Sequence, residues 1–402
     1  MGFPLSFEPV TEQKQWFRDQ FTVTAYVILG FFMFSRSVLA PFITYRTAEN
    51  QGITGILGAH VMISALGIIA AGLFWARIAG IASRKVVVFY ASTLLAVGAL
   101  GLGSTYIPLS FASAFLLGAS GSVLNITLQS ALSDEHGKNR RIALGEAAVV
   151  SSLFGAAAPF VIAACARVPV VGWRAGLIVP LVLLLCLVPL VRRTRIPEYP
   201  HLESQANSKR TRKSLPTIFW TWVLLLFLCS ATEWAVIYWG AAFLHQALGV
   251  PVDLASVILG TFLGVEILGK ALWSFFSHRF STVRLMIVGI FIGLVGILCM
   301  MLSTHLSGAP VVAVVSLMIF GIGISGTSQL GTSAALALPK SLSTIAMSRI
   351  SLSTGLSVVL FPFLIGLIAQ TTGILDAFVV PLVTCSLALI VSILVKRQRP
   401  ET

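Results

Sequence analysis

Long apolar runs separated by short polar segments dominate the chain. A window of about 19 residues resolves twelve such runs, at residues 19–42, 53–75, 86–106, 108–131, 142–166, 175–191, 217–244, 252–276, 284–304, 309–334, 342–370 and 374–395. Each approaches or exceeds the roughly 20 residues that a helix needs to cross a hydrocarbon layer about 30 Å thick. The pattern predicts an all-α membrane protein with twelve transmembrane helices.

The composition agrees with this fold class and excludes others. Hydrophobic residues make up 57% of the chain and charged residues 10%, where soluble proteins carry about 25% charged residues. The five cysteines lie in the apolar runs, without the spacing of a metal site. No phosphate-binding Walker sequence is present. We therefore expect no cofactor, no bound metal and no ATP-driven step.

The positive charges are distributed asymmetrically. Most of the 27 lysines and arginines fall in the termini and in loops on one side, whereas the other side holds Arg46, Arg167 and Arg174. Cytoplasmic loops are enriched in such residues, so both termini are expected in the cytoplasm. The net charge of +13 then reflects orientation and attraction to anionic lipids. We expect a multi-pass protein of the cell membrane, the inner membrane in a Gram-negative bacterium, with no nucleic-acid partner.

An internal repeat divides the chain into two halves. The segment Ile142–Phe160 aligns without gaps with Ile345–Phe363, which pairs Pro159 with Pro362 and Glu146 with Arg349. The same offset places Asn125 of the fourth run on Ser328 of the tenth. We expect two pseudo-symmetric six-helix bundles. The predicted parts are a cytoplasmic segment 1–18, a bundle 19–191, a linker 192–216, a bundle 217–395 and a tail 396–402.

The loop after the second run carries a short motif that points to a family. Gly72 is followed five residues later by Arg77 and then by Arg84-Lys85, and the second half repeats a remnant around Arg279. With the 6+6 arrangement, this motif resembles that of the major facilitator superfamily. Ala76 and His278 stand where the family has Asp. The ion pairs of this loop motif are therefore expected to be weaker than in the family or to use other residues.

The resemblance implies transport by alternating access through a cavity between the halves. It also assigns Arg77, Arg84, Lys85 and Arg279 to a cytoplasmic gate. The fifth and eleventh helices of the family line the seam, so Glu146 and Arg349 are expected either to gate or to reach the lipid head groups.

Charged residues inside the apolar runs suggest a coupling site. An intramembrane charge costs about 2.5–3.5 kcal/mol on insertion scales, and neither Arg36 nor Glu233 has an opposite charge within one helical turn. We interpret both as substrate-binding and proton-coupling residues, since the proton affinity of a buried carboxylate depends on nearby cations. Glu266 and Lys270 are four residues apart, a spacing typical of a neutral intrahelical pair.

Polar stripes predict the cavity wall. Helical spacing puts Asn125 and Gln129 on one face, and the repeat-related stripe carries Ser325 and Ser328 with Gln329 beside them. Trp234 and Tyr238 lie one turn apart next to Glu233. Interhelical hydrogen bonding and an interfacial aromatic belt are the alternative explanations of these residues.

These features predict a monomeric secondary transporter that moves a small organic solute by alternating access with protons, and they slightly favour efflux. An uptake symporter for organic acids or sugars, or a facilitative uniporter, is the alternative within this fold. An integral membrane lipid-modifying enzyme is a distant alternative, because the sole acidic loop cluster, Asp134-Glu135-His136, lies among basic residues. The expected partners are the solute, protons and the lipid bilayer.

Overall fold

The computed structural model describes residues 18–49, 54–136, 140–198, 216–277, 279–306, 308–335 and 340–398, and these residues contain helices and no strands. The first half comprises α1 (Gln20–Ser37), α2 (Leu39–Glu49), α3 (Thr54–Ile81), α4 (Arg84–Gly101), α5 (Ile107–His136), α6 (Arg140–Cys165) and α7 (Val179–Arg193). The second half comprises α8 (Thr217–Leu248), α9 (Val252–Phe276), α10 (Thr282–Leu302), α11 (Ala309–Ile324), α12 (Thr327–Ala335), α13 (Lys340–Thr372), α14 (Ile374–Ala377) and α15 (Val379–Gln398).

Twelve segments of these helices are long and apolar enough to cross a membrane, which confirms the predicted number. Several of them are interrupted, among them the first and the tenth. The first breaks at Val38 between α1 and α2, where Pro41 has no N–H to donate to the carbonyl of Ser37. The tenth breaks at Ser325-Gly326 between α11 and α12. Both interruptions lie in segments that the sequence assigned to the central cavity.

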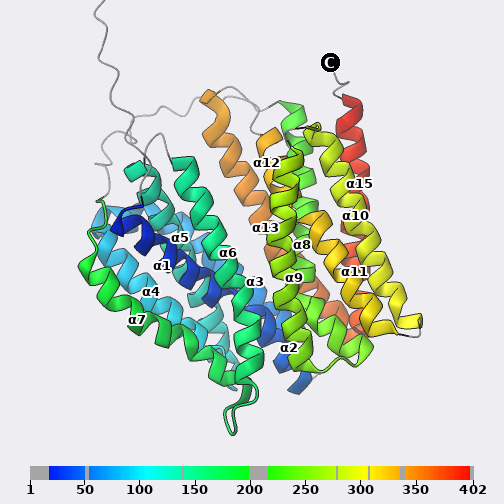
Figure 1. Ribbon diagram of the computed structural model, residues 1–402, viewed down its shortest axis with the longest axis horizontal. Coiled ribbons are helices and arrows are strands. Elements are labelled where there is room, and N and C mark those ends of the chain that lie inside the picture. Colours follow the sequence, from blue (N-terminus) through cyan, green and yellow to red (C-terminus); the bar gives the residue numbers. More distant parts are fainter. Residues whose placement is uncertain are drawn as a thin grey trace, which may run out of the picture.

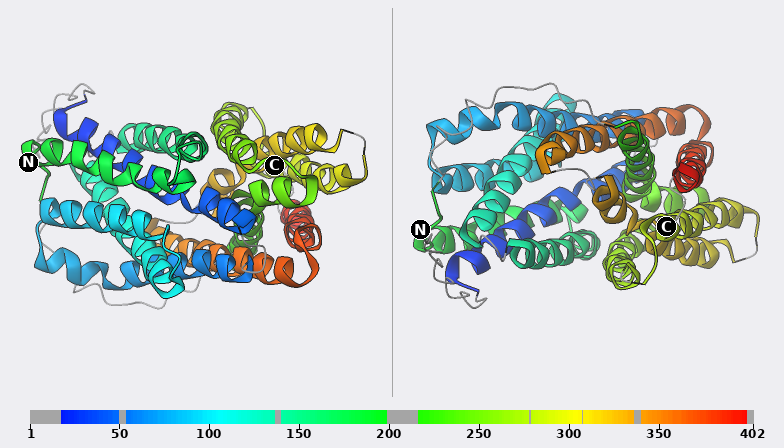
Figure 2. Two further views of the ribbon diagram at one scale, coloured as in Figure 1. Left: turned by 90° about the horizontal axis from the view of Figure 1, so that it is seen from below. Right: turned by 90° about the horizontal axis from the view of Figure 1, so that it is seen from above.

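The spans form two groups. Within the first half α3 and α4 pack on α5, and α1 packs on α6; within the second, α10 packs on α11 and α8 on α13 and α15. The groups meet along α3 with α13, α6 with α9 and α2 with α8, and they lie side by side in Figures 1 and 2. The architecture is therefore two helical bundles with a seam between them.

Glycines allow close approach of helices in both halves. A Cβ atom on Gly118 of α5 would overlap the backbone carbonyl oxygen of Ser64 in α3. A Cβ atom on Gly323 of α11 would lie 2.5 Å from the backbone nitrogen of Gly293 in α10. Backbone-to-backbone packing of this kind is typical of membrane helices.

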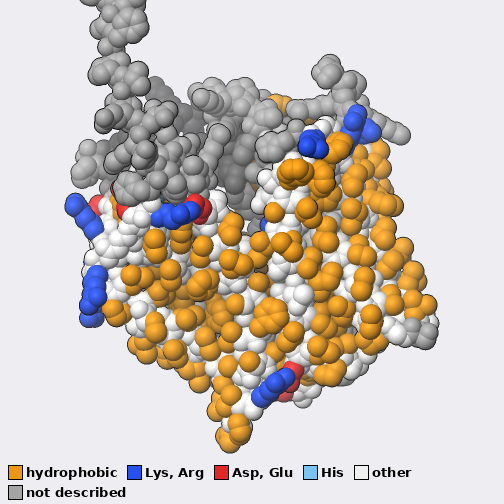
Figure 3. All heavy atoms as spheres, in the orientation of Figure 1, with side chains coloured by type: hydrophobic (Ala, Val, Ile, Leu, Met, Phe, Trp, Pro, Cys, Tyr) orange, Lys and Arg blue, Asp and Glu red, His pale blue; other side chains and the backbone are white. Residues whose placement is uncertain are grey.

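The surface is suited to a bilayer. On the face shown in Figure 3, hydrophobic side chains cover the middle of the molecule, while acidic and basic side chains gather toward its two edges. We call the edge near the start of α8 and the end of α15 the linker side (Figure 1).

The two halves are joined by hydrogen bonds at the end opposite the linker side. The Tyr45 hydroxyl donates to Asp253 Oδ1 at 2.5 Å. The Gly55 backbone N–H donates to Gln370 Oε1 at 3.1 Å. Tyr45 and Gly55 belong to the first half and their partners to the second, so these bonds hold the opposite side closed.

Candidate functional site

A cavity of about 600 Å³ lies between the halves. Seven of the twelve spans form its wall. The lining side chains include Arg36 of α1, Asn125 of α5, Glu233 and Trp234 of α8, Lys270 of α9, and Ser325, Ser328 and Gln329 of the tenth span. It runs from mid-helix positions such as Glu233 to Thr332 and Ile350, which lie near the linker-side ends of α12 and α13. The cavity therefore extends toward the linker side.

A smaller cavity of about 140 Å³ adjoins the first. The two share Arg36, Glu233, Trp234 and Lys270 in their walls. Tyr238 and Glu266 line only the smaller one. The charged residues thus lie at the junction between an open polar space and a narrower recess.

Arg36 lies against an aromatic surface rather than against an acid. Its guanidinium carbon is 4.7 Å from the centre of the Trp234 ring, a cation–π distance. Tyr238, whose ring centre is 5.7 Å from that of Trp234, is close enough to interact with the same guanidinium. Among the described residues, no carboxylate forms an ion pair with Arg36. The aromatic pair fixes the cation at the cavity wall.

The cation next to Glu233 is Lys270, not Arg36. Lys270 Nζ lies 3.9 Å from Glu266 Oε2, and Glu266 also interacts electrostatically with Glu233. Both glutamates are buried, and Glu266 Oε1 has no hydrogen-bond partner among the described residues. Two carboxylates thus share one lysine.

The sequence prediction omitted Glu266 and Lys270 from the site. Their spacing of four residues is that of an ion pair within one helix, and such a pair gives no indication of a partner on another helix. The signal that could have included them is the third ionisable residue, Glu233, on the preceding span.

The amide and hydroxyl residues differ in position. Asn125 lines the cavity, and its Oδ1 accepts a hydrogen bond of 2.9 Å from Gln129 Nε2. Gln129 is exposed and lies outside the cavity wall. Ser328 and Gln329 are exposed on the wall, whereas Ser325 is buried and donates to the Ile322 carbonyl at 3.0 Å.

Two of the predicted gate residues bind within the first half. The buried Arg84 guanidinium pairs with Asp134 of α5 and donates to the carbonyl oxygens of Pro197 and Glu198 at 3.2 and 3.1 Å. Lys85 Nζ donates to the Arg192 carbonyl at 2.7 Å, at the C-terminal end of α7. Cations at a helix C-terminus are stabilised by its exposed carbonyls.

The remaining predicted gate residues are separate from these. Glu146 accepts two hydrogen bonds from Arg18, at 2.8 and 2.7 Å, and a third from Tyr26 at 3.1 Å. Arg349 is exposed, and the Arg279 guanidinium carbon lies 5.5 Å from the centre of the Phe275 ring. The side chain of Arg77 lies outside the described residues, as does His278.

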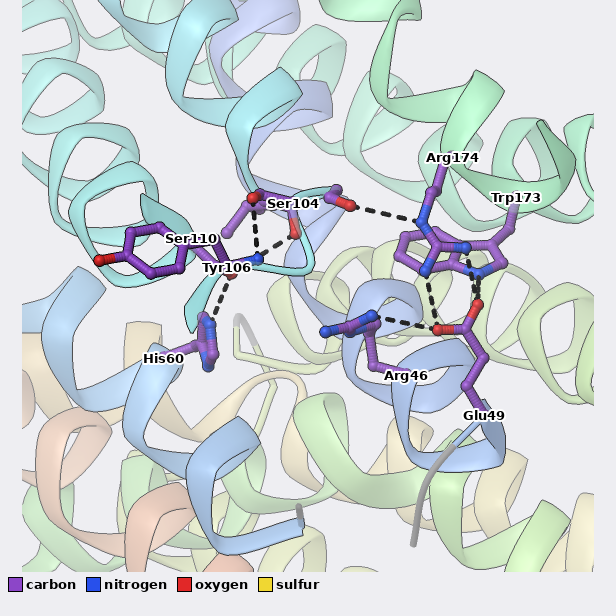
Figure 4. Close-up of polar contacts among 10 residues, drawn as sticks. Arg46, Glu49, His60, Ser104, Tyr106, Ser110, Trp173 and Arg174 are labelled. Carbon is purple, nitrogen blue, oxygen red and sulfur yellow. Dashed lines mark hydrogen bonds and ion pairs between the residues drawn. The ribbon is translucent and has the colours of Figure 1, made fainter. Parts of the chain in front are cut away.

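A polar cluster braces the end opposite the linker side (Figure 4). The Glu49 carboxylate accepts hydrogen bonds from Arg174 at 2.7 and 2.8 Å, from Trp173 Nε1 at 2.9 Å and from Arg46 at 3.2 Å. Trp173 also stacks on Tyr45, with ring centres 5.8 Å apart. The residue that bonds across the halves is therefore held by its own half.

His60, also in Figure 4, is a structural residue in this arrangement. Its ring nitrogens lie 2.7 Å from Ser110 Oγ and 2.9 Å from the Ile56 carbonyl oxygen, and it is 2% exposed. Within the described part of the chain, no three His, Cys, Asp or Glu side chains are grouped as metal ligands.

Comparison with known proteins identifies the family. The model of the Major Facilitator Superfamily matches residues 25–337 and 222–402. No curated protein matches the chain.

Solved structures with a similar fold are transporters. A bacterial homologue of the human lysosomal transporter Spinster, inward-facing and unoccupied, has a TM-score of 0.77 at 15% identity, covering 94% of this chain and 97% of that one. A D-xylose-proton symporter has a TM-score of 0.78 at 13% identity, covering 95% and 98%. The nucleoside transporter NupG has a TM-score of 0.69 at 15% identity, covering 95% and 99%. The chain belongs to the major facilitator superfamily.

Proposed function

We propose that this protein is a proton-coupled secondary transporter of a small polar organic solute, and that the central cavity is its binding site. The observation that carries the proposal is the composition of the cavity wall, where Arg36, Glu233 and Lys270 face one space from both halves. Ionisable residues buried in a membrane protein mark solute and ion pathways. Asn125, Ser328 and Gln329 supply hydrogen bonds to the solute.

The way in which the halves meet supports alternating access. The cavity extends to the linker side, and Tyr45 with Asp253 holds the other side closed. To release the solute on that side, the halves rock until this bond breaks and the linker-side ends approach each other. We assign the linker side to the cytoplasm because the basic loops lie there. Arg84 and Lys85 then belong to the cytoplasmic gate, together with Arg77, Arg279, Glu146 and Arg349.

The substitution Glu233→Gln tests the coupling. It removes a titratable group but keeps the shape of the side chain, so we expect pH-driven flux to be lost while the protein stays folded. A thermal-shift screen on purified protein first identifies a solute that binds, because ligands stabilise the folded state. Flux of that solute is then measured in proteoliposomes under pH gradients of both signs, which also gives the direction of transport.

The matched control is Asp376→Asn, which removes an exposed carboxylate outside the cavities. The control should transport as the wild type does. Unchanged pH-driven flux in Glu233→Gln would remove this residue from the mechanism.

A further inference from the structure

Arg36 is a cation in the middle of the molecule that lies against aromatic rings and not directly against an acid. Trp234 and Tyr238 hold it in place, but neither neutralises it, and among the described residues it forms no ion pair. Arg36 is partly exposed to the cavities, and a charge inside a membrane-spanning segment that lacks an opposite charge is costly. A guanidinium presents paired N–H donors that match the two oxygens of a carboxylate. The missing partner is therefore best supplied by an anionic group of the solute.

The remaining charges determine when such an anion can enter. Glu233, Glu266 and Lys270 form a cluster beside Arg36. With both carboxylates ionised, the four groups sum to zero, and an added monoanion leaves a net negative charge in a recess of low polarity. With one carboxylate protonated, the site carries a single positive charge and a monoanion neutralises it. Anion binding and protonation therefore favour each other.

Glu266 Oε1 offers a place for that proton. This buried oxygen has no hydrogen-bond partner among the described residues, while Glu266 Oε2 lies on the side of Lys270. A proton there leaves Lys270 to pair with Glu233. The proton comes from solvent through the cavity and returns to solvent on release, so no other group needs to gain or lose one.

No further described charge changes this balance. Cys229 lies buried one helical turn before Glu233 on α8, and α11, α12 and the described part of α15 near Cys385 contribute no charged side chain beside it. Arg349 on α13 is exposed and outside both cavity walls. Arg46 and Glu49 of α2 pair with each other.

The neutral part of the wall indicates the rest of the solute. Beyond the charged cluster, the cavity presents hydroxyl and amide groups. These belong to Ser230, Ser328, Gln329, Thr332, Ser351 and Thr354. Groups that both donate and accept hydrogen bonds suit a hydroxylated molecule better than a hydrocarbon one.

We propose that the solute is a small hydroxylated organic monocarboxylate, bound through its carboxylate to Arg36 and loaded together with one proton on the Glu233–Glu266 pair. The inference rests on the proposed transport function and names its substrate class. Because the loaded site is neutral, the proton and the acid cross together. An inward proton gradient then drives uptake, rather than the efflux that the sequence slightly favours.

The first experiment compares acids with neutral analogues of similar size. Thermal shift and calorimetry on purified protein use gluconate with sorbitol, lactate with lactamide, and glycerate with glycerol. We expect at least one acid to bind at least tenfold more tightly than its analogue. We also expect Arg36→Gln to lose this preference and Arg167→Gln, which alters an exposed arginine outside the cavities, to keep it.

The second experiment counts protons. The acid that binds is added as its sodium salt to weakly buffered wild-type protein at several pH values from neutral upward, and proton uptake is read with an indicator dye. We expect the uptake to rise with pH toward one proton per bound anion, because only a pair with both carboxylates ionised gains a proton on binding. In Glu233→Gln and Glu266→Gln the uptake should be abolished while the anion still binds. Two variants at different positions separate loss of the proton site from misfolding, which melting temperatures also report.

The outcomes are distinct. If every acid fails to bind, or if a neutral analogue binds as tightly as its acid, the substrate class is wrong; a transported neutral solute would then leave the proposed transport function intact. If the acid binds without proton uptake at every pH tested, the joint loading is wrong. If no solute of any class shows pH-driven flux, the transport proposal itself fails.

Discussion

At the scale of single residues, the cavity wall depends on side chains that position one another. Asn125 faces the cavity, and Gln129, one turn away, donates a hydrogen bond to its Oδ1. The amide of Asn125 is thereby oriented with its N–H₂ group available to the cavity. The sequence predicted that both residues line the cavity, whereas only Asn125 does so and Gln129 orients it.

Asn125→Ala should therefore weaken solute binding more than Gln129→Ala. The first change removes a group that contacts the solute; the second removes one hydrogen bond of about 1 kcal/mol, or roughly fivefold in affinity. Isothermal titration with the solute from the screen measures both. Expression should match the wild type, and an equal loss of expression in both variants would show that the pair holds helices together instead.

Some features of the site residues were predictable from their spacing in the sequence, and others were not. Spacing along one helix placed Asn125 and Ser328 on the cavity wall and identified Glu233 as a buried acid. Spacing cannot give the rotation of one helix against its neighbour. That rotation places Lys270 of α9 beside Glu233 of α8 and turns Arg36 toward Trp234. The contacts between side chains of different helices could therefore not be predicted from the pattern of hydrophobic and polar residues.

At the scale of helices, the closest contacts are made where the chain has no side chain. Gly118 packs α5 directly on the backbone of α3, and Gly323 packs α11 on α10. The repeat predicted that the fourth and tenth spans play equivalent roles, and both use glycine in this way. The spans themselves were predictable because each has to be long and apolar, whereas the interruptions at Val38 and Ser325 carry weaker signals.

Gly118→Ala should lower the melting temperature of the purified protein. The added methyl group collides with the Ser64 carbonyl, and overpacking of this kind costs about 1–3 kcal/mol. The matched control is Gly145→Ala on α6, where a Cβ atom meets nothing within 4 Å. Alanine favours a helix over glycine, so the control should be unchanged or more stable. Equal melting temperatures for the two variants would show that α3 and α5 tolerate separation.

At the scale of the whole molecule, the hydrogen bonds at the closed end can shift the balance between the access states that we propose. The hydrogen bonds described between the halves lie at one end, and Tyr45 donates there to a carboxylate. Hydrogen bonds to charged groups contribute about 1.5–3 kcal/mol. A population ratio changes about tenfold for each ~1.4 kcal/mol, so this one bond can decide which side is open.

Tyr45→Phe should therefore shift the population toward the state open on the opposite side, by roughly tenfold or more. Spin labels at Arg167 and Asp376, on a background without the five native cysteines, report the separation of the halves at that end. We expect a longer-distance population to grow in the variant. Tyr106→Phe, which alters an exposed tyrosine, is the control. An unaltered distance distribution in Tyr45→Phe would show that other contacts keep this end closed.

The Glu49 cluster makes the two halves unequal partners in that opening. Glu49 is bound by three residues of the half that contains Tyr45, namely Arg174, Trp173 and Arg46. These contacts hold the surroundings of Tyr45 in a fixed position. Asp253, in contrast, stands in the first turn of α9. If the protein opens at this end, we expect the first half to keep its structure there and the second half to move away from it. Arg174→Gln should weaken the Glu49 cluster while leaving the Tyr45–Asp253 hydrogen bond possible. We then expect a broader range of distances between the halves at this end.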